Sequence, residues 1–323
     1  TTTPSTIQAA GLDSNIPAGK ITNQYYTLDF GYVTVPEKWK SVMDYKFTKT
    51  DAYVLTNTNK GYGYTANITL NMQPTEALSF TASYTHTVQK EMSGMPGSNA
   101  ESAFTYVPTV KGPNNIELHN SQYVTPDRVV ASGTYSDKSN NHFSIFYQGW
   151  NGGMGAYSYI YDGDINQDGT AADLLYIPAT KDELMFATEA DKENFWAFVE
   201  QDKYLSTHKG QYAEAYSVYS PWVHRLNFRY AHDFKFNIGK SENKLQLNVD
   251  INNILNMFNP KWGVAKYMNT AINEGRILSV DHINNEGAPV FKSNVKAGMP
   301  TWTPSSGLGQ CWYFQVGIKY MFN

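Results

Sequence analysis

One stretch, residues 223–256, constrains the fold more than any other part of the sequence. It reads as two strands joined by the turn Gly239-Lys240-Ser241-Glu242, with apolar side chains on one parity and polar ones on the other. The apolar set is Leu226, Phe228, Tyr230, Phe234, Phe236, Ile238, Leu245, Leu247, Val249 and Ile251. Side chains on a strand alternate between two faces, so this hairpin has one apolar and one hydrophilic face. Such a sheet either packs its apolar face into a soluble core or turns it to lipid in an outer-membrane barrel.

The same alternation recurs along the chain. Further alternating segments are 62–72, 78–88, 129–135, 143–147 and 312–322, with weaker ones at 25–35 and 45–56. Turn-like runs at Gln73-Pro74-Thr75-Glu76 and Asp137-Lys138-Ser139-Asn140 separate the first four into two more hairpins. About eight strands are therefore predicted, each with one apolar and one polar face.

The connections between these strands alternate between short and long. The long ones cover residues 91–125, 151–220 and 257–309, and the second contains a predicted helix from Glu189 to Leu205 with Thr188 as its N-cap. A soluble sandwich has no reason to obey this alternation, whereas an outer-membrane barrel has short periplasmic turns and long extracellular loops. The sequence predicts an all-β fold, an antiparallel transmembrane β-barrel segment over residues 45–323, with residues 1–44 unassigned between strand and loop.

Composition narrows the alternatives. Aromatic residues make up 15% of the 323 residues, with 24 Tyr and 7 Trp, while the mean hydropathy is -0.47. No window approaches the roughly 18 apolar residues that a membrane helix needs, which excludes helical membrane proteins. Many Tyr and Trp at low hydropathy are expected of a barrel with aromatic girdles, and also of a carbohydrate-binding sandwich. A net charge of -4 without a basic cluster argues against nucleic acid as a partner.

Several segments carry a resemblance to a known family. They are FVEQDKYLSTHKGQYAE (198–214), SPWVHRL (220–226), VLTNTNKGY (54–62), GDINQDG (163–169) with LYIP (175–178), and NNILN (252–256). Together they resemble the late barrel region of TonB-dependent outer-membrane receptors, in particular the Oar-like branch, whose members carry a carboxypeptidase-regulatory-like domain. The closing YMFN (320–323) is similar to the aromatic end signal that barrel-assembly machinery reads.

The resemblance implies a fold, partners and a function. Such receptors have a plug domain inside a 22-stranded barrel, so we expect this chain to be the C-terminal third of a larger receptor whose natural N-terminus precedes Thr1. The implied partners are outer-membrane lipid, the plug and remaining strands, the TonB complex and an imported ligand that the sequence does not identify. The implied location is the outer membrane of a Gram-negative bacterium. A passive or adhesive barrel and a soluble calcium-binding, glycan-recognising sandwich remain alternatives.

One loop has the spacing of a calcium site. Asp164, Asn166 and Asp168 stand at alternate positions before Gly169, as in the first half of a calcium-binding loop. Leu175 occupies the twelfth position, where a bidentate Glu is expected, so Asp173 or Asp162 would have to substitute. The alternative interpretation is an Asp- and Asn-rich turn held by its own side-chain-to-backbone hydrogen bonds.

No catalytic constellation accompanies these features. The chain has neither a Gly-x-Ser-x-Gly nor a His-Glu-x-x-His motif, and His86, His208, His224 and His232 lack partners at metal spacing, so an enzyme is not expected. His232 falls on the apolar parity, which a bulge near Ala231 or an interfacial depth would explain. An aromatic belt at the membrane interface is predicted from Trp150, Tyr157, Tyr159, Tyr161, Tyr219 and Trp222.

Overall fold

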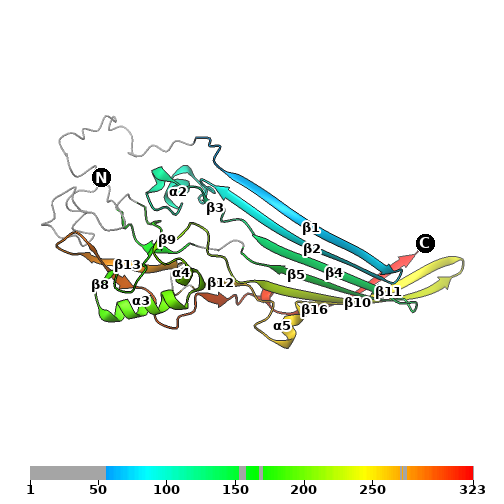
Figure 1. Ribbon diagram of the computed structural model, residues 1–323. Coiled ribbons are helices and arrows are strands. Elements are labelled where there is room, and N and C mark those ends of the chain that lie inside the picture. Colours follow the sequence, from blue (N-terminus) through cyan, green and yellow to red (C-terminus); the bar gives the residue numbers. More distant parts are fainter. Residues whose placement is uncertain (1–55, 153–157, 167–169, 270, 272–274, 323) are drawn as a thin grey trace, which may run out of the picture.

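The computed structural model describes residues 56–152, 158–166, 170–269, 271 and 275–322. These residues form two parts, a long antiparallel sheet and a cap built from the long connections at one end of it (Figure 1). The predicted strands at 25–35 and 45–56 lie outside the described residues, apart from Thr56.

The long sheet contains every other predicted strand. Its members, in spatial order, are β1 (Tyr62–Thr75), β2 (Leu78–Glu91), β4 (Asp127–Ser136), β5 (Asn141–Trp150), β10 (Val223–Ile238), β11 (Ser241–Asn252) and β16 (Tyr313–Phe322), with β3 (His119–Asn120) beside β2. All of these pairs are antiparallel. Within the described ranges β1 and β16 are the two edges of an open sheet and do not pair with each other.

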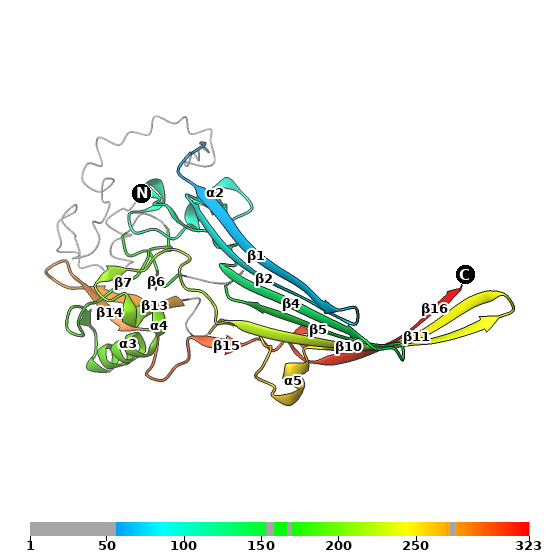
Figure 2. The same cartoon turned by 45° about the vertical axis from the view of Figure 1, so that its right-hand side comes forward.

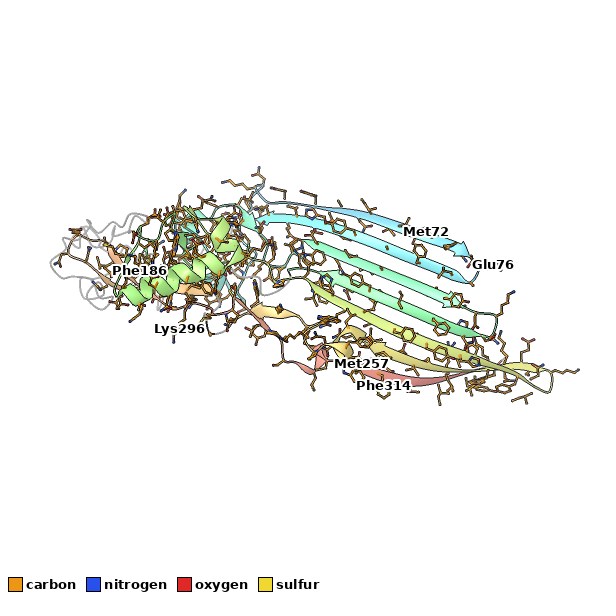
Figure 3. All side chains as sticks on the ribbon, turned by 60° about the horizontal axis from the view of Figure 1, so that its bottom comes forward. Met72, Glu76, Phe186, Met257, Lys296 and Phe314 are labelled. Atoms are coloured by element: carbon orange, nitrogen blue, oxygen red, sulfur yellow. The ribbon has the colours of Figure 1, made fainter. Side chains whose placement is uncertain are left out.

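The register aligns apolar side chains into rows that cross the whole sheet. One row consists of Met72, Phe80, Gly133, Ile145, Phe228, Ile251 and Phe314. Its side chains and those of the parallel rows stand out from the sheet, and Ile68 and Ile318 are 74% and 71% exposed (Figure 3). Hydrophilic residues form most of the rows of the opposite face, with exceptions such as Phe146 between Ser132 and Asn227 and Val130 between Ser83 and Gln148. The predicted separation of the two faces is thus present across seven long strands.

The connections 151–220 and 257–309 build a second sheet together. It consists of β6 (Ile160–Asp162), β13 (Arg276–Ile283), β14 (Pro289–Ser293) and β8 (Met185–Phe186), in this order. The outer pairs are parallel and the central pair is antiparallel. Two shorter ladders join β7 (Tyr176–Ile177) to β9 (Gln211–Tyr212) and β12 (Lys266–Met268) to β15 (Trp302–Pro304).

The predicted helix at 189–205 is two helices. α3 (Glu189–Gln201) begins after Thr188, whose hydroxyl accepts the Asp191 N–H as predicted, and α4 (Lys203–Thr207) follows. Asp202 divides them because its backbone is extended and its side chain caps α4. Shorter helical segments are α2 (Ala100–Thr105), α5 (Ile254–Phe258) and the 3-10 turns Pro113–Asn115 and Leu308–Gln310. No described helix is long and apolar enough to cross a membrane.

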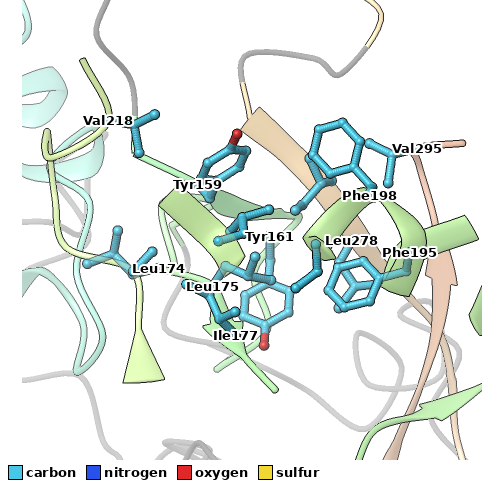
Figure 4. Close-up of a cluster of buried hydrophobic side chains, with 14 of the residues drawn as sticks. Tyr159, Tyr161, Leu174, Leu175, Ile177, Phe195, Phe198, Val218, Leu278 and Val295 are labelled. Carbon is cyan, nitrogen blue, oxygen red and sulfur yellow. The ribbon is translucent and has the colours of Figure 1, made fainter. Parts of the chain in front are cut away.

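The main buried core lies in the cap. Phe195 and Phe198 of α3 pack against side chains of both cap-forming connections, among them Leu278, Leu175 and Tyr161 (Figure 4). Tyr159 and Tyr161 are only 0% and 1% exposed, so their predicted place in an interfacial aromatic belt is wrong. They lie inside the core because the cap, and not the wall of the sheet, surrounds β6.

Candidate functional site

The hydrophilic face of the long sheet has two regions of different chemistry. On β1, β2 and β4 it carries hydroxyl and amide groups that bond to one another across strands. Asn67 donates to Ser83 Oγ at 2.8 Å and Thr85 Oγ1 at 2.7 Å, and Ser79 and Thr134 share a hydrogen bond of 2.7 Å. Apart from Glu91 and Arg128 at the cap end of β2 and β4, this half is a wall of uncharged groups, most of which both donate and accept hydrogen bonds.

On β10 and β11 the same face carries charges around Asp233. The carboxylate is 5% exposed and accepts from Lys244 Nζ at 2.8 Å and Gln246 Nε2 at 2.7 Å, with His142 Nε2 at 3.1 Å. Two rows away on this face, Arg229 lies 3.4 Å from Asp250. Charged groups of this kind need water or polar partners, since burying them unpaired costs several kcal/mol each. This half of the face is therefore suited to water or to a polar protein surface.

The cap is fastened to the hydrophilic face by the segment 252–256. Asn253 adopts a left-handed backbone with φ 52° and donates to the carbonyls of Gly263 at 3.2 Å and Gln310 at 2.7 Å. Asn256 donates to the carbonyls of residues 260 and 262 and accepts the Trp312 N–H. Arg225 reaches Gly263 O and Gln310 Oε1 from β10 and lies 5.5 Å from the Trp150 ring. Asn253 and Asn256 therefore hold the two ends of the third long connection through hydrogen bonds to backbone carbonyls.

Gly263 is the position in this anchor where a side chain is least tolerated. Its φ is +65°, and an added Cβ would lie 1.9 Å from Asn253 Oδ1. Gly263→Ala is expected to destabilise the anchor by about 2 to 3 kcal/mol, through backbone strain and the displaced Asn253 amide. The matched control is Gly298→Ala, where φ is +77° and nothing lies within 4 Å, so only about 1 kcal/mol of strain is expected. Equal losses in chemical denaturation would contradict the anchoring role of Asn253.

The structure brings only some of the proposed calcium ligands close to one another. Asp173 is fully buried, and its Oδ2 accepts the backbone N–H groups of Ile165 at 2.7 Å and Asn166 at 3.2 Å. This places Asp173 against the segment that contains Asp164 and Asn166. Asp162 ends β6 with an exposed side chain, and Asp168 lies outside the described residues. Across the part of the chain that the structure describes, no three His, Cys, Asp or Glu side chains form a metal-sized group.

Calcium binding therefore remains a prediction, and Asp173 is the residue that tests it. Asp173→Ala removes two charge-assisted hydrogen bonds and is expected to cost about 2 to 4 kcal/mol without calcium. If the loop also binds the ion, calcium will raise the melting temperature of the native chain and not that of the variant. Melting curves in calcium and in chelator give the answer, and a native chain that melts identically in both would leave Asp173 as a turn-closing residue alone.

The histidines have partners of other kinds. His224 Nδ1 and the Tyr147 hydroxyl are 2.7 Å apart, His86 Nδ1 is 2.9 Å from Asp127 Oδ1, and His208 stacks on Tyr204. His232 pairs with Leu247 without a register shift, so no bulge occurs at Ala231. Its Nδ1 lies 2.8 Å from Asn141 Oδ1, at the last pair that β10 forms with β5.

The residues of the predicted aromatic belt lie in different surroundings. Trp222 is exposed and stacks on His224 at a centroid distance of 5.8 Å, next to the apolar face. Trp150 instead lies beside Arg225 on the hydrophilic parity, Tyr219 is half-buried, and Tyr157 lies outside the described residues. The alternation of β5 was sufficient to assign Trp150 to the hydrophilic face, since Phe143, Ile145 and Tyr147 occupy the other parity.

Comparison with known proteins does not extend this description. No family model, no curated protein and no solved structure matches the chain.

Proposed function

We propose that the chain is the C-terminal barrel part of a TonB-dependent outer-membrane receptor, which imports a large ligand with energy from the inner membrane. The observation that carries the membrane part of this proposal is the apolar face. It continues over seven paired strands, and many of its large side chains are exposed, including Leu70, Ile145, Val316 and Phe314. An exposed apolar surface of this extent marks a contact with protein or lipid, and antiparallel strands with an outward apolar face are typical of outer-membrane barrels.

The receptor part of the proposal rests on the opposite face and on the cap. Groups that need water or polar partners, such as Asp233 and Arg229, suit a wide lumen that holds water and a plug. Among the described residues β1 and β16 have no strand on their outer sides, which supports further strands, because every backbone group must be paired within hydrocarbon. The resemblance of segments such as 198–214 and 252–256 to TonB-dependent receptors supports the specific family.

Cell fractionation and conductance together test this function. We expect the intact protein in the outer-membrane fraction, extractable only with detergent. In planar bilayers the purified protein is expected to stay closed, since a plug fills the lumen of such receptors. A steady open conductance would favour the passive pore, and release into buffer without detergent would favour the soluble sandwich.

A further inference from the structure

A shallow groove of about 430 Å³ lies on the apolar face near the end of the sheet where the short turns are. The side chains of Phe234, Leu247, Val249 and Val316 supply its apolar lining, and Asn141 and His232 lie on the side of β5. It forms because β4 and β5 end at the Asp137–Asn140 turn while β10 and β11 continue to Ile238 and Ser241. Figure 2 shows this hairpin and β16 extending beyond the other strands.

Three polar residues of the groove meet at one atom, whereas the fourth, Asn248, donates to Asp250. Asn141 Oδ1 accepts the Tyr230 hydroxyl at 2.8 Å and lies 2.8 Å from His232 Nδ1, while Asn141 Nδ2 donates to Asp137 Oδ2. The groove is therefore amphiphilic, with a fixed polar cluster next to the turn and apolar side chains over β11 and β16. A ligand that fits it needs a polar end and an apolar body.

We propose that this groove binds one acyl chain of a membrane phospholipid, with the headgroup beside Asn141 and His232. The inference rests on the proposed membrane function and goes beyond it by naming a lipid site. The floor strand β11 is hydrogen-bonded to β10 on one side and to β16 on the other, so the floor offers no unpaired backbone. A peptide in the groove would leave its own backbone groups unpaired against Leu247 and Val249, whereas a hydrocarbon chain has none to satisfy.

The apolar contacts also favour a flexible chain. Leu247 and Val316 are exposed, and Phe234 lies edge-on to the His232 ring at a centroid distance of 4.5 Å. A shallow groove suits an acyl chain, which adapts its shape and gains from burying each methylene. A second copy of this protein is the competing occupant, and the experiment distinguishes it.

Native mass spectrometry of the intact protein tests this site. The probe is a nanodisc of phosphatidylethanolamine, from which the protein is transferred into mild detergent and its retained lipids are counted. The wild type is expected to retain one phospholipid. Val316→Trp, which fills the groove, is expected to retain about tenfold less. The control Ile145→Trp places the same ring on the same face, outside the groove, and is expected to match the wild type, with folding of both variants checked by circular dichroism.

The outcomes separate this inference from the proposed function. A wild type that retains no lipid, a Val316→Trp variant that retains as much as the wild type, or a dimer that replaces the lipid-bound monomer would overturn the lipid site alone. Protein that stays in solution without detergent and never enters the nanodisc would overturn both proposals.

Discussion

Replacing Ala131 with arginine is expected to cost about 2 to 4 kcal/mol of folding free energy in a lipid bilayer, if Ala131 lies near the midplane. Ala131 occupies the middle of β4, in an apolar row between Ala82 and Tyr147. On the proposed lipid side, the guanidinium would have to extend to the membrane surface or thin the bilayer around it. Refolding from urea into phosphatidylcholine vesicles, followed by circular dichroism, measures this cost.

The adjacent residue provides the matched control. Ser132 is similar in size and lies in the same strand, but it faces Thr81 and Phe146 on the hydrophilic side. Ser132→Arg is therefore expected to cost no more than about 1 kcal/mol, because its charge remains in water. If the two variants refold with equal losses, our assignment of lipid and lumen faces is incorrect.

The long strands could be predicted because each carries its own evidence. In β10 and β11 the apolar and polar residues alternate over almost the whole length of both strands, and period two is a local property of the chain. The turn around Gly239 is equally local, since its φ of +63° is a conformation that glycine adopts readily. The two faces of each long strand, and the pairing of strands within a hairpin, thus follow from neighbouring residues.

The cap could not be predicted in the same way, because its partners are far apart in sequence. β6 pairs in parallel with β13, more than a hundred residues later, and β8 has only the two residues Met185 and Phe186. Strands this short show no periodicity. The broken helix had a local signal that was missed, since an aspartate such as Asp202 caps a new helix better than it continues an old one.

The largest effect on the cap is expected at Asp202, which joins the two cap-forming connections. The carboxylate is buried, and its Oδ2 accepts from the Tyr159 hydroxyl at 2.5 Å and from Thr301 Oγ1 at 2.7 Å. Its Oδ1 accepts the N–H groups of Tyr204 and Leu205, both at 2.9 Å. Asp202→Ala leaves buried donors without an acceptor and is expected to destabilise the cap by about 3 to 5 kcal/mol.

Hydrogen exchange over α3 and the cap sheet measures this loss without requiring the long sheet to unfold. Asp202→Asn should fall between the native chain and Asp202→Ala, because its amide oxygen still caps α4 while its NH₂ group replaces an acceptor. The control is Thr188→Ala, which removes a cap of α3 at the surface and is expected to cost about 1 kcal/mol. If the amides of the cap are as well protected from exchange in Asp202→Ala as in Thr188→Ala, this account of Asp202 is incorrect.

The same contact makes the cap sensitive to high pH. Burial, and then the neighbouring Asp202 carboxylate, raise the pKa of the Tyr159 hydroxyl well above its ordinary value. The folded chain therefore keeps this proton at a pH where the unfolded chain, with tyrosines near pKa 10, releases it. The stability from this group is complete below pH 10 and falls above it by about 1.4 kcal/mol per pH unit until the folded pKa is reached. Tyr159→Phe removes the titrating proton. The protection of cap amides from exchange should therefore fall less steeply above pH 10 in this variant than in the native chain. Identical slopes would show that other tyrosines cause the pH dependence.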